Sequence, residues 1–236
     1  MRHSARVEPA RAAAFSRALR RWFRKNGRNL PWRKTRDPYR VLVSEAMLQQ
    51  TQVSRVVGYY DRFLDRFPTM DALAKARPGM VRESWEGLGY YARARNLHAL
   101  AREVAELPSE PSQLRALPGV GPYTAGAVAS FAFERRAALV DTNVARVLRR
   151  VFAPRANFKT SCGQKRLWSI AEAILPRTGK TTWTHNQALM ELGALVCTAR
   201  VARCSRCPVV DYCKTGNREA GVGNRATTTA GTGKGK

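Results

Sequence analysis

The sequence predicts an all-α protein. Apolar residues recur three or four positions apart along most of the chain, as Phe15, Leu19 and Phe23 do, which is the periodicity of a helix with one buried face. Few segments alternate apolar and polar residues as a half-exposed strand would. Pro-Gly pairs at residues 78–79 and 118–119 divide the pattern into short helices joined by turns.

The N-terminal helix is expected over residues 9–25, and residues 26–36, rich in Asn, Gly, Arg and Pro, are expected to form a loop. Asp37 as the N-cap and Pro38 in the first turn then begin a second helix, which we expect to run over residues 39–60. Further helices are expected at residues 70–76, 78–86, 91–106, 111–116, 123–133, 142–152, 163–175 and 183–196.

The two ends of the chain differ in composition from the rest. Residues 1–8 are basic and carry little apolar side chain, so we expect a loose arm. Residues 215–236 are rich in Gly, Thr and Lys and have almost nothing to bury, so we expect a disordered tail.

Basic residues far exceed acidic ones, with 42 Lys and Arg against 17 Asp and Glu and a net charge of +25. Such an excess indicates a polyanionic partner, either nucleic acid or an acidic membrane surface, and we favour nucleic acid. No apolar run reaches the roughly 18 residues of a transmembrane helix, and the N-terminus lacks a secretory signal. We therefore expect a monomeric, cytoplasmic, nucleoid-associated protein of prokaryotic origin.

Four cysteines lie close together near the C-terminus, at Cys197, Cys204, Cys207 and Cys213. Four thiolates at this spacing can surround one metal centre, and an unexported chain favours metal ligation over disulfides. Structural zinc also accepts four thiolates, although zinc ribbons usually use two tight Cys-x2-Cys pairs and only one is present here. Cys162 is most simply a lone thiol.

Residues 117–126 (LPGVGPYTAG) join two expected helices through a glycine-rich turn. Gly119, Val120 and Gly121 leave backbone N–H groups unobstructed beside the N-terminus of the following helix, which is an arrangement that binds a phosphate without reading sequence. Three arginines between the cysteines are expected to contact phosphates as well: Arg200, Arg203 and Arg206.

Two acidic residues stand out as candidates for chemistry. On the helix expected over 39–60, Glu45 shares a face with Val41, Leu48 and Gln52, so burial should raise its pKa. Asp141 precedes another expected helix, where an aspartate alone is best read as an N-cap. Its place downstream of the glycine hairpin favours a functional role instead.

Together these stretches resemble the MutY adenine DNA glycosylases of the helix–hairpin–helix glycosylase superfamily. The hairpin and the cysteine spacing are also typical of the related endonuclease III proteins. The matching stretches are residues 30–33 (LPWR), 44–53 (SEAMLQQTQV), 87–98 (GLGYYARARNLH), 117–126, 140–144 (VDTNV) and 186–193 (NQALMELG), with the four cysteines.

The resemblance implies two all-α lobes with DNA in the cleft between them. One lobe, a helical barrel that includes the hairpin, would comprise residues 36–136. The other would combine residues 9–35 with residues 137–214 and hold a [4Fe–4S] cluster, with zinc as the less favoured alternative. In this family the cluster is a structural and DNA-binding element and not the catalyst.

The resemblance also implies a division of labour at the active site. Glu45 would protonate the adenine and Asp141 would stabilise the sugar cation, while Asn143 and Tyr123 would orient these carboxyl groups. Tyr123 stands where endonuclease III-type enzymes have the lysine that forms a Schiff base. A phenol cannot form one, so we expect a monofunctional glycosylase that leaves an abasic site.

Further residues are expected to hold the flipped nucleotide and its partner in double-stranded DNA. Gln50 and Tyr90 resemble residues that wedge into the gap, although Tyr90 also fits a plain core aromatic. The remaining contacts implied by the resemblance are Thr51 and Leu88 beside the wedge, and Arg33 and Glu191 in the adenine pocket.

The sequence departs from the family in two ways. Thr142 stands where many relatives have glycine, and the chain ends 23 residues after Cys213, where relatives usually continue into an 8-oxoguanine-recognition domain. We therefore expect weaker discrimination of 8-oxoguanine from guanine opposite adenine. Two alternatives stay open: a thymine or uracil mismatch glycosylase of the same superfamily, and a non-catalytic DNA-binding protein with a structural metal.

Overall fold

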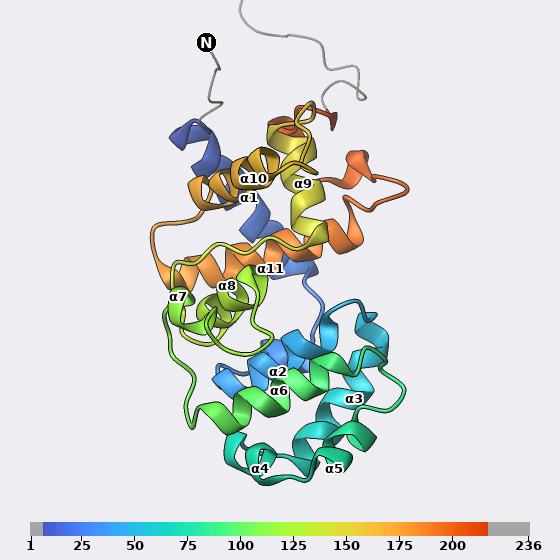
Figure 1. Ribbon diagram of the computed structural model, residues 1–236. Coiled ribbons are helices and arrows are strands. Elements are labelled where there is room, and N and C mark those ends of the chain that lie inside the picture. Colours follow the sequence, from blue (N-terminus) through green and yellow to red (C-terminus); the bar gives the residue numbers. More distant parts are fainter. Residues whose placement is uncertain (1–6, 217–236) are drawn as a thin grey trace, which may run out of the picture.

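A computed structural model describes residues 7–216 of the chain (Figure 1). Its regular elements are α-helices and short 3-10 turns, and the described residues contain no strand beyond one isolated bridge between Cys197 and Ala202. The predicted all-α class is therefore confirmed. The α-helices are α1 Pro9–Asn26, α2 Pro38–Leu48, α3 Val53–Arg66, α4 Met70–Lys75, α5 Pro78–Ser84, α6 Ala92–Glu103, α7 Pro111–Leu114, α8 Pro122–Phe131, α9 Thr142–Phe152, α10 Ser161–Ala173 and α11 Gly179–Leu195.

Most of the predicted arm and tail falls on residues 1–6 and 217–236, which lie outside the described residues. Within the part of the chain that the structure describes, no helix combines the length and the apolar character needed to cross a membrane.

The single helix predicted over residues 39–60 is wrong, because the chain turns between α2 and α3. Asp37 caps the start of α2 as predicted, accepting a hydrogen bond from the Arg40 amide at 3.0 Å. At the other end Gln50 has a left-handed φ of 57°, which no helix can continue through. Gln52 consequently caps α3 and does not share the face of Glu45.

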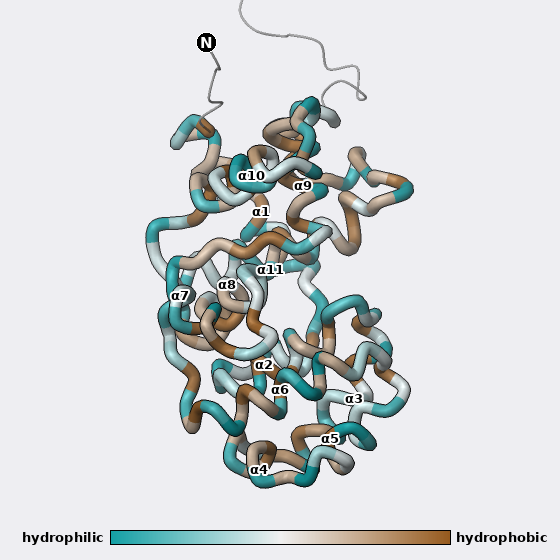
Figure 2. The backbone as a smooth tube through the Cα atoms, viewed as in Figure 1, coloured by the Kyte–Doolittle hydropathy of each residue, from teal (hydrophilic) through white to brown (hydrophobic). Residues whose placement is uncertain are grey.

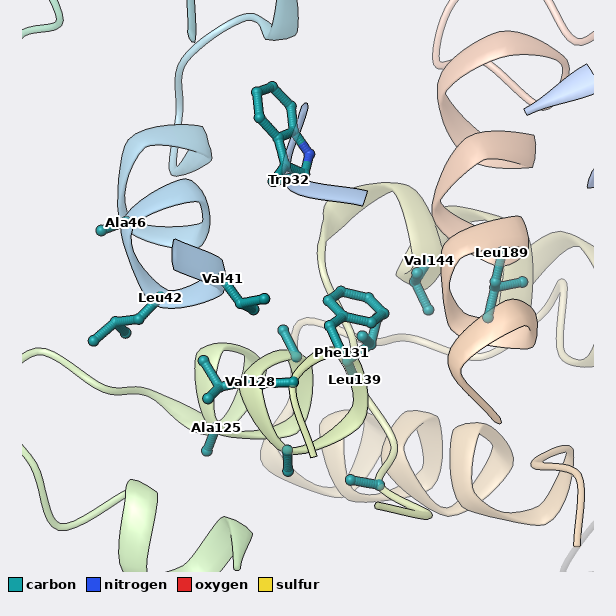
Figure 3. Packing of buried hydrophobic residues seen from close by; sticks show 14 of the residues in the cluster. Trp32, Val41, Leu42, Ala46, Ala125, Val128, Phe131, Leu139, Val144 and Leu189 are labelled. Carbon is teal, nitrogen blue, oxygen red and sulfur yellow. The ribbon is translucent and has the colours of Figure 1, made fainter. Parts of the chain in front are cut away.

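The helices form two packed groups (Figure 1). Helices α1, α9, α10 and α11 make one group and helices α2 to α6 the other, while α8 packs against both α2 and α11. Every residue of α8 from Thr124 to Phe131 is buried, as expected of a short apolar helix at the centre of a molecule. Figure 3 shows Phe131 of α8 between Val41 of α2 and Val144 of α9.

The segment that joins α8 to α9 runs across α11, and much of it is hydrophobic in Figure 2. Ala137 and Leu139 bury their side chains there. The amide of Asn186 on α11 donates 2.9 Å hydrogen bonds to the Ser130 hydroxyl and the Ala137 carbonyl. Gly126 allows the close approach, since a Cβ at that position would stand 2.0 Å from the Ala138 carbonyl oxygen. This packing fixes where α9 begins, and with it Asp141.

Candidate active site and cysteine loop

Glu45 lies in the middle of α2 and is 3% exposed. Its Oε2 atom has no hydrogen-bond partner among residues 7–216. Burial raises the pKa of Glu45 to about 7, the neighbouring Tyr123 hydroxyl lowers it, the Asp141 carboxylate raises it, and Arg33 lowers it. The predicted burial of Glu45 is confirmed, and the result is a carboxyl group that holds its proton close to neutral pH with one oxygen left free.

The raised pKa of Glu45 makes stability depend on pH. Below about pH 4.5 the carboxyl is protonated in both the folded and unfolded chain; above that the unfolded chain loses the proton first. Between pH 4.5 and 7 the free energy of unfolding of the wild type should therefore fall by about 3 kcal/mol relative to that of Glu45→Gln. Above pH 7 the difference between the two proteins should stay constant. Urea unfolding of both proteins from pH 5 to 8 measures this, and parallel stability curves would contradict it.

Tyr123 reaches the same site from the first turn of α8, which Gly121 caps. Its hydroxyl lies beside Glu45 and 3.9 Å from the Met190 sulfur of α11. Burial raises the pKa of Tyr123 well above its usual value, and Glu45 and Asp141 raise it further. The phenol therefore stays protonated and can donate a hydrogen bond to the Glu45 carboxyl group.

Asp141 is half-buried and serves as the N-cap of α9. Its Oδ1 accepts a hydrogen bond from the backbone amide of Val144 at 2.6 Å, and its Oδ2 accepts one from the side-chain Nδ2 of Asn143 at 3.2 Å. Burial raises the pKa of Asp141, while these hydrogen bonds and the Arg146 charge oppose the shift. Asp141 therefore caps α9 and also lies beside Glu45, so its structural role as an N-cap does not exclude a functional role.

Arg146, one turn further along α9, was not foreseen. Its Nη2 donates 2.7 Å hydrogen bonds to the Asn143 side chain and the Gly193 carbonyl, and its Nε donates one of 2.8 Å to the Cys197 carbonyl. Helices α9 and α11 meet closely here, since a Cβ on Gly193 would stand 2.7 Å from the Asn143 Cβ. Arg146 thus joins the residue that orients Asp141 to the first cysteine of the loop.

The four cysteines line one cavity of about 340 Å³. Arg150 of α9 donates a 3.3 Å hydrogen bond to the Cys197 sulfur, and the Gly216 amide donates one of 3.2 Å to the Cys213 sulfur. Among residues 7–216, however, no three His, Cys, Asp or Glu side chains stand in position to ligate one metal ion. Arg200, Arg203 and Arg206 are exposed on the same loop.

Arg33 and Glu191, both predicted pocket residues, lie together in a buried ion-pair network. The Glu191 carboxylate is 1% exposed and accepts from Arg33 Nη2 at 2.9 Å and from Arg28 Nη2 at 2.8 Å. Burial raises the pKa of Glu191, but hydrogen bonds from Arg28 and Arg33 lower it to about 2. The Nε of Arg33 also donates to Gln187 at 2.7 Å. Glu191 is thus fully engaged within the protein, and Arg28 and Gln187 complete a network that was not predicted.

The predicted wedge residues lie on two neighbouring turns. Gln50 and Tyr90 are both exposed, Tyr90 by 62%, and both have left-handed backbones, with φ of 57° and 49°. Tyr90 as a core aromatic is therefore excluded. Thr51 is half-buried, whereas Leu88 is only 5% exposed, so its side chain packs inward and does not reach the surface.

Arg93, which was not predicted, holds both turns. Its guanidinium donates to the Ala46 and Met47 carbonyls at the end of α2, at 3.0 and 2.7 Å, and to the Leu88 and Gly89 carbonyls, at 3.2 and 2.9 Å. It also lies 5.5 Å from the centre of the Tyr90 ring. A single buried cation therefore ends α2 and fixes the turn that presents Tyr90.

The glycine hairpin forms a tight turn, but one of its amides is not free as predicted, because the Val120 amide donates a 3.2 Å hydrogen bond to the Leu117 carbonyl. Gly119 has a left-handed φ of 72°, and a Cβ there would stand 2.6 Å from the Asn96 Cβ, so both conformation and space require glycine. Gly121 is exposed at the N-terminus of α8. Val120 buries its side chain at 8% exposure, so the amides of Gly119 and Gly121 are the hairpin's candidates for contact with a ligand.

An all-α fold in which a glycine hairpin and two carboxyl groups meet at the junction of two helix groups matches a known family. Residues 43–174 match the HhH-GPD superfamily of base excision DNA repair proteins. The chain belongs to this family.

Several relatives are similar over most of the chain. The rat adenine DNA glycosylase is 44% identical across 89% of this chain and 43% of its own length. The Mycobacterium tuberculosis adenine DNA glycosylase is 42% identical across 81% of this chain and 64% of its own length. A solved thermostable thymine-DNA glycosylase superposes with a TM-score of 0.80 at 30% identity, covering 89% of this chain and 98% of that one.

The chain thus spans less than half the length of the rat protein and about two thirds of the mycobacterial one. Relatives come from mammals as well as bacteria, so they do not favour the prokaryotic origin that we expected.

Proposed function

We propose that the protein is a monofunctional glycosylase that removes adenine mispaired with 8-oxoguanine or guanine in double-stranded DNA, acting as a monomer. The observation that carries the proposal is Glu45, a buried carboxyl group with a pKa near 7 and an unpartnered oxygen beside Asp141. The names of the similar relatives support adenine as the base.

Adenine leaves readily only once a ring nitrogen has been protonated, and its departure leaves a positively charged sugar. Glu45 donates the proton from Oε2, and the negative charge of the Asp141 carboxylate stabilises the cation until water adds. Tyr123 holds the Glu45 carboxyl, and Asn143, held by Arg146, orients Asp141. The Arg33–Glu191 network forms a charged wall of the adenine pocket.

The DNA contacts of the proposal follow from exposed groups. The amides of Gly119 and Gly121 bind a backbone phosphate at the N-terminus of α8, while the Val120 amide is held by the Leu117 carbonyl. The side chains of Gln50 and Tyr90 enter the space that the flipped nucleotide leaves, with Thr51 and Leu88 supporting their turns. The lobe boundaries proposed from the sequence, 36–136 against 9–35 with 137–214, place this DNA between the two helix groups.

We assign the cysteine loop to a [4Fe–4S] cluster, with zinc as the alternative. The chemistry of the donor set fits, because four thiols and no other acidic group line a single cavity. The Arg150 guanidinium and the Gly216 amide already donate to two of the sulfurs, as is usual around metal-bound thiolates. When bound, the cluster would hold residues 197–213 in one shape and present Arg200, Arg203 and Arg206 to phosphates.

A panel of four labelled duplexes tests the proposal under single-turnover conditions. We expect excision of adenine opposite 8-oxoguanine and opposite guanine, and little excision of thymine or uracil opposite guanine. The structural similarity to a thymine-DNA glycosylase makes thymine the second candidate, and faster loss of thymine would establish it. No excision from any duplex, with DNA binding retained, would favour a non-catalytic DNA-binding protein.

Tyr123 leads to a separate prediction about the product. Because a phenol cannot form a Schiff base, excision should leave an intact strand with an abasic site. Borohydride should trap no protein–DNA adduct, and the strand should break only after alkali, which also serves as the control that excision took place. Strand scission without heat or alkali, together with a trapped adduct, would show a lyase amine elsewhere in the site.

A further inference from the structure

A groove of about 1430 Å³ runs between α1 and α10, apart from every residue predicted to contact DNA. Figure 1 shows both helices at the end of the molecule away from α4 and α5, and residues of both line this groove. Each presents one stripe at helical spacing to the groove. The stripe of α1 comprises Pro9, Ala12, Ala13, Ser16, Arg17 and Arg20, and that of α10 comprises Cys162, Lys165, Arg166, Ser169, Ile170 and Ala173.

The floor of the groove is apolar. Ala12, Ile170 and Ile174 are buried at its base, with exposed fractions of 5%, 4% and 1%. Ala13 on α1 and Ala173 on α10 also line the groove, and both are exposed. Small and branched aliphatic side chains therefore line most of the trough. The one buried polar side chain of its lining, Ser16 at 3% exposure, has its hydroxyl within 2.9 Å of His185 Nδ1, so it is already partnered inside the protein.

The rim of the groove is strongly basic. Five cations line it, and none of them makes an ion pair with a carboxylate among residues 7–216; Glu8 is the one acid in the lining. Burial lowers the pKa of Arg20, and the Arg24 and Arg17 charges on the same helix lower it further, so Arg20 stands among like charges on α1. An anionic occupant would relieve that repulsion. The five are Arg17, Arg20, Lys165, Arg166 and Arg177.

We propose that this groove binds an acidic amphipathic helix of a partner protein. An apolar stripe on such a helix matches the floor, and acidic residues on its flanks match the unpaired cations. The α1 stripe extends from Pro9 to Arg20, which is 12 residues and enough for about three helical turns of the partner. DNA fits less well, because a phosphate backbone offers nothing to bury against the aliphatic floor.

A designed probe tests the groove without knowledge of the natural partner. The probe is a fluorescein-labelled peptide of leucine and glutamate, about four turns long, with all leucines on one face. Its control has the same composition with the leucines spread around the helix. In fluorescence anisotropy, the amphipathic peptide should bind at least about tenfold more tightly than the control. Equal affinities would mean unspecific attraction to a basic protein and would overturn the proposal.

Two double variants locate the binding. Arg17→Glu with Arg166→Glu, and separately Ala13→Trp with Ala173→Trp, should each weaken peptide binding by at least about tenfold, the first by charge and the second by filling the trough. All four residues are exposed. The matched charge control is Arg77→Glu with Arg102→Glu, exposed cations outside the groove, which should change the affinity by less than about twofold. A loss as large in this control would overturn the proposal.

Cys162 gives a readout that needs no variant. Its thiol is exposed in the groove, so bound peptide should slow its alkylation, measured by mass spectrometry at that residue. Unchanged alkylation at saturating peptide would contradict the proposal. Duplex DNA should neither protect Cys162 nor displace the peptide; if it does both, the groove is a nucleic-acid surface. Adenine excision is measured separately and has no bearing on these outcomes.

Discussion

Glu45→Gln is expected to lower the rate of adenine excision by about 10²- to 10⁴-fold, which is the usual contribution of a positioned general acid. Glutamine fills the same buried space in α2 and keeps an oxygen near Tyr123, but it has no proton to give to the leaving base. Affinity for the mismatched duplex should change by less than about twofold, because Glu45 contributes little surface. Single-turnover excision and anisotropy with the same duplex separate the two effects.

The pH profile provides a second, independent sign of the same role. Because the pKa of Glu45 is about 7, the fraction that carries a proton falls as the pH rises through 7, and wild-type excision should fall with it. The residual activity of Glu45→Gln should lack this descending limb. The matched control is Glu106→Gln, an exposed glutamate on the surface, which should behave as wild type. If Glu45→Gln excises adenine at the wild-type rate, the proposed chemistry fails.

Periodicity was a sufficient guide to Glu45 but not to its neighbours on the chain. Val41, Glu45 and Leu48 recur at helical spacing, so the burial of Glu45 could be predicted from local pattern alone. The same pattern extended the helix too far, through Gln52 to residue 60, whereas α2 ends at Leu48. What ends α2 is Arg93, whose guanidinium binds the carbonyls of Ala46 and Met47 from more than 40 positions away. No local sequence signal reports such a contact.

The same reason explains the other missed residues. Arg28 and Arg146 are two of 42 basic residues in the chain, and DNA binding alone could account for that excess of charge. Nothing in the sequence therefore distinguished these two arginines from the others. Only the packing of α1, α9 and α11 shows that Arg28 neutralises buried Glu191 and that Arg146 joins Asn143 to the cysteine loop. Leu88 shows the converse, because a motif placed it at the DNA while packing turned its side chain inward.

Cys207→Ser is expected to have the largest effect on the protein as a whole. Cys207 lies in the tight pair of the loop, and the described segment around it holds only short turns and the single Cys197–Ala202 bridge. If the loop holds the proposed cluster, ligation would supply most of the order of this segment, and loss of one thiolate would remove it. We expect the variant to lose its iron and acid-labile sulfide and either to fail to fold or to bind duplex DNA at least about tenfold more weakly.

Cys162→Ser is the matched control, because Cys162 is an exposed thiol on α10 far along the chain from the loop. It should keep wild-type metal content, colour and DNA affinity. Anaerobic analysis of iron, sulfide and zinc in wild type and both variants decides the identity of the centre as well. If the wild type contains zinc and no iron, the centre is a structural zinc site and not an iron–sulfur cluster. Full metal content and DNA affinity in Cys207→Ser would contradict the assignment of the cysteines to a metal site.

The contrast with Glu45→Gln is the decisive one, since Glu45→Gln should abolish excision while the metal content and duplex binding stay intact.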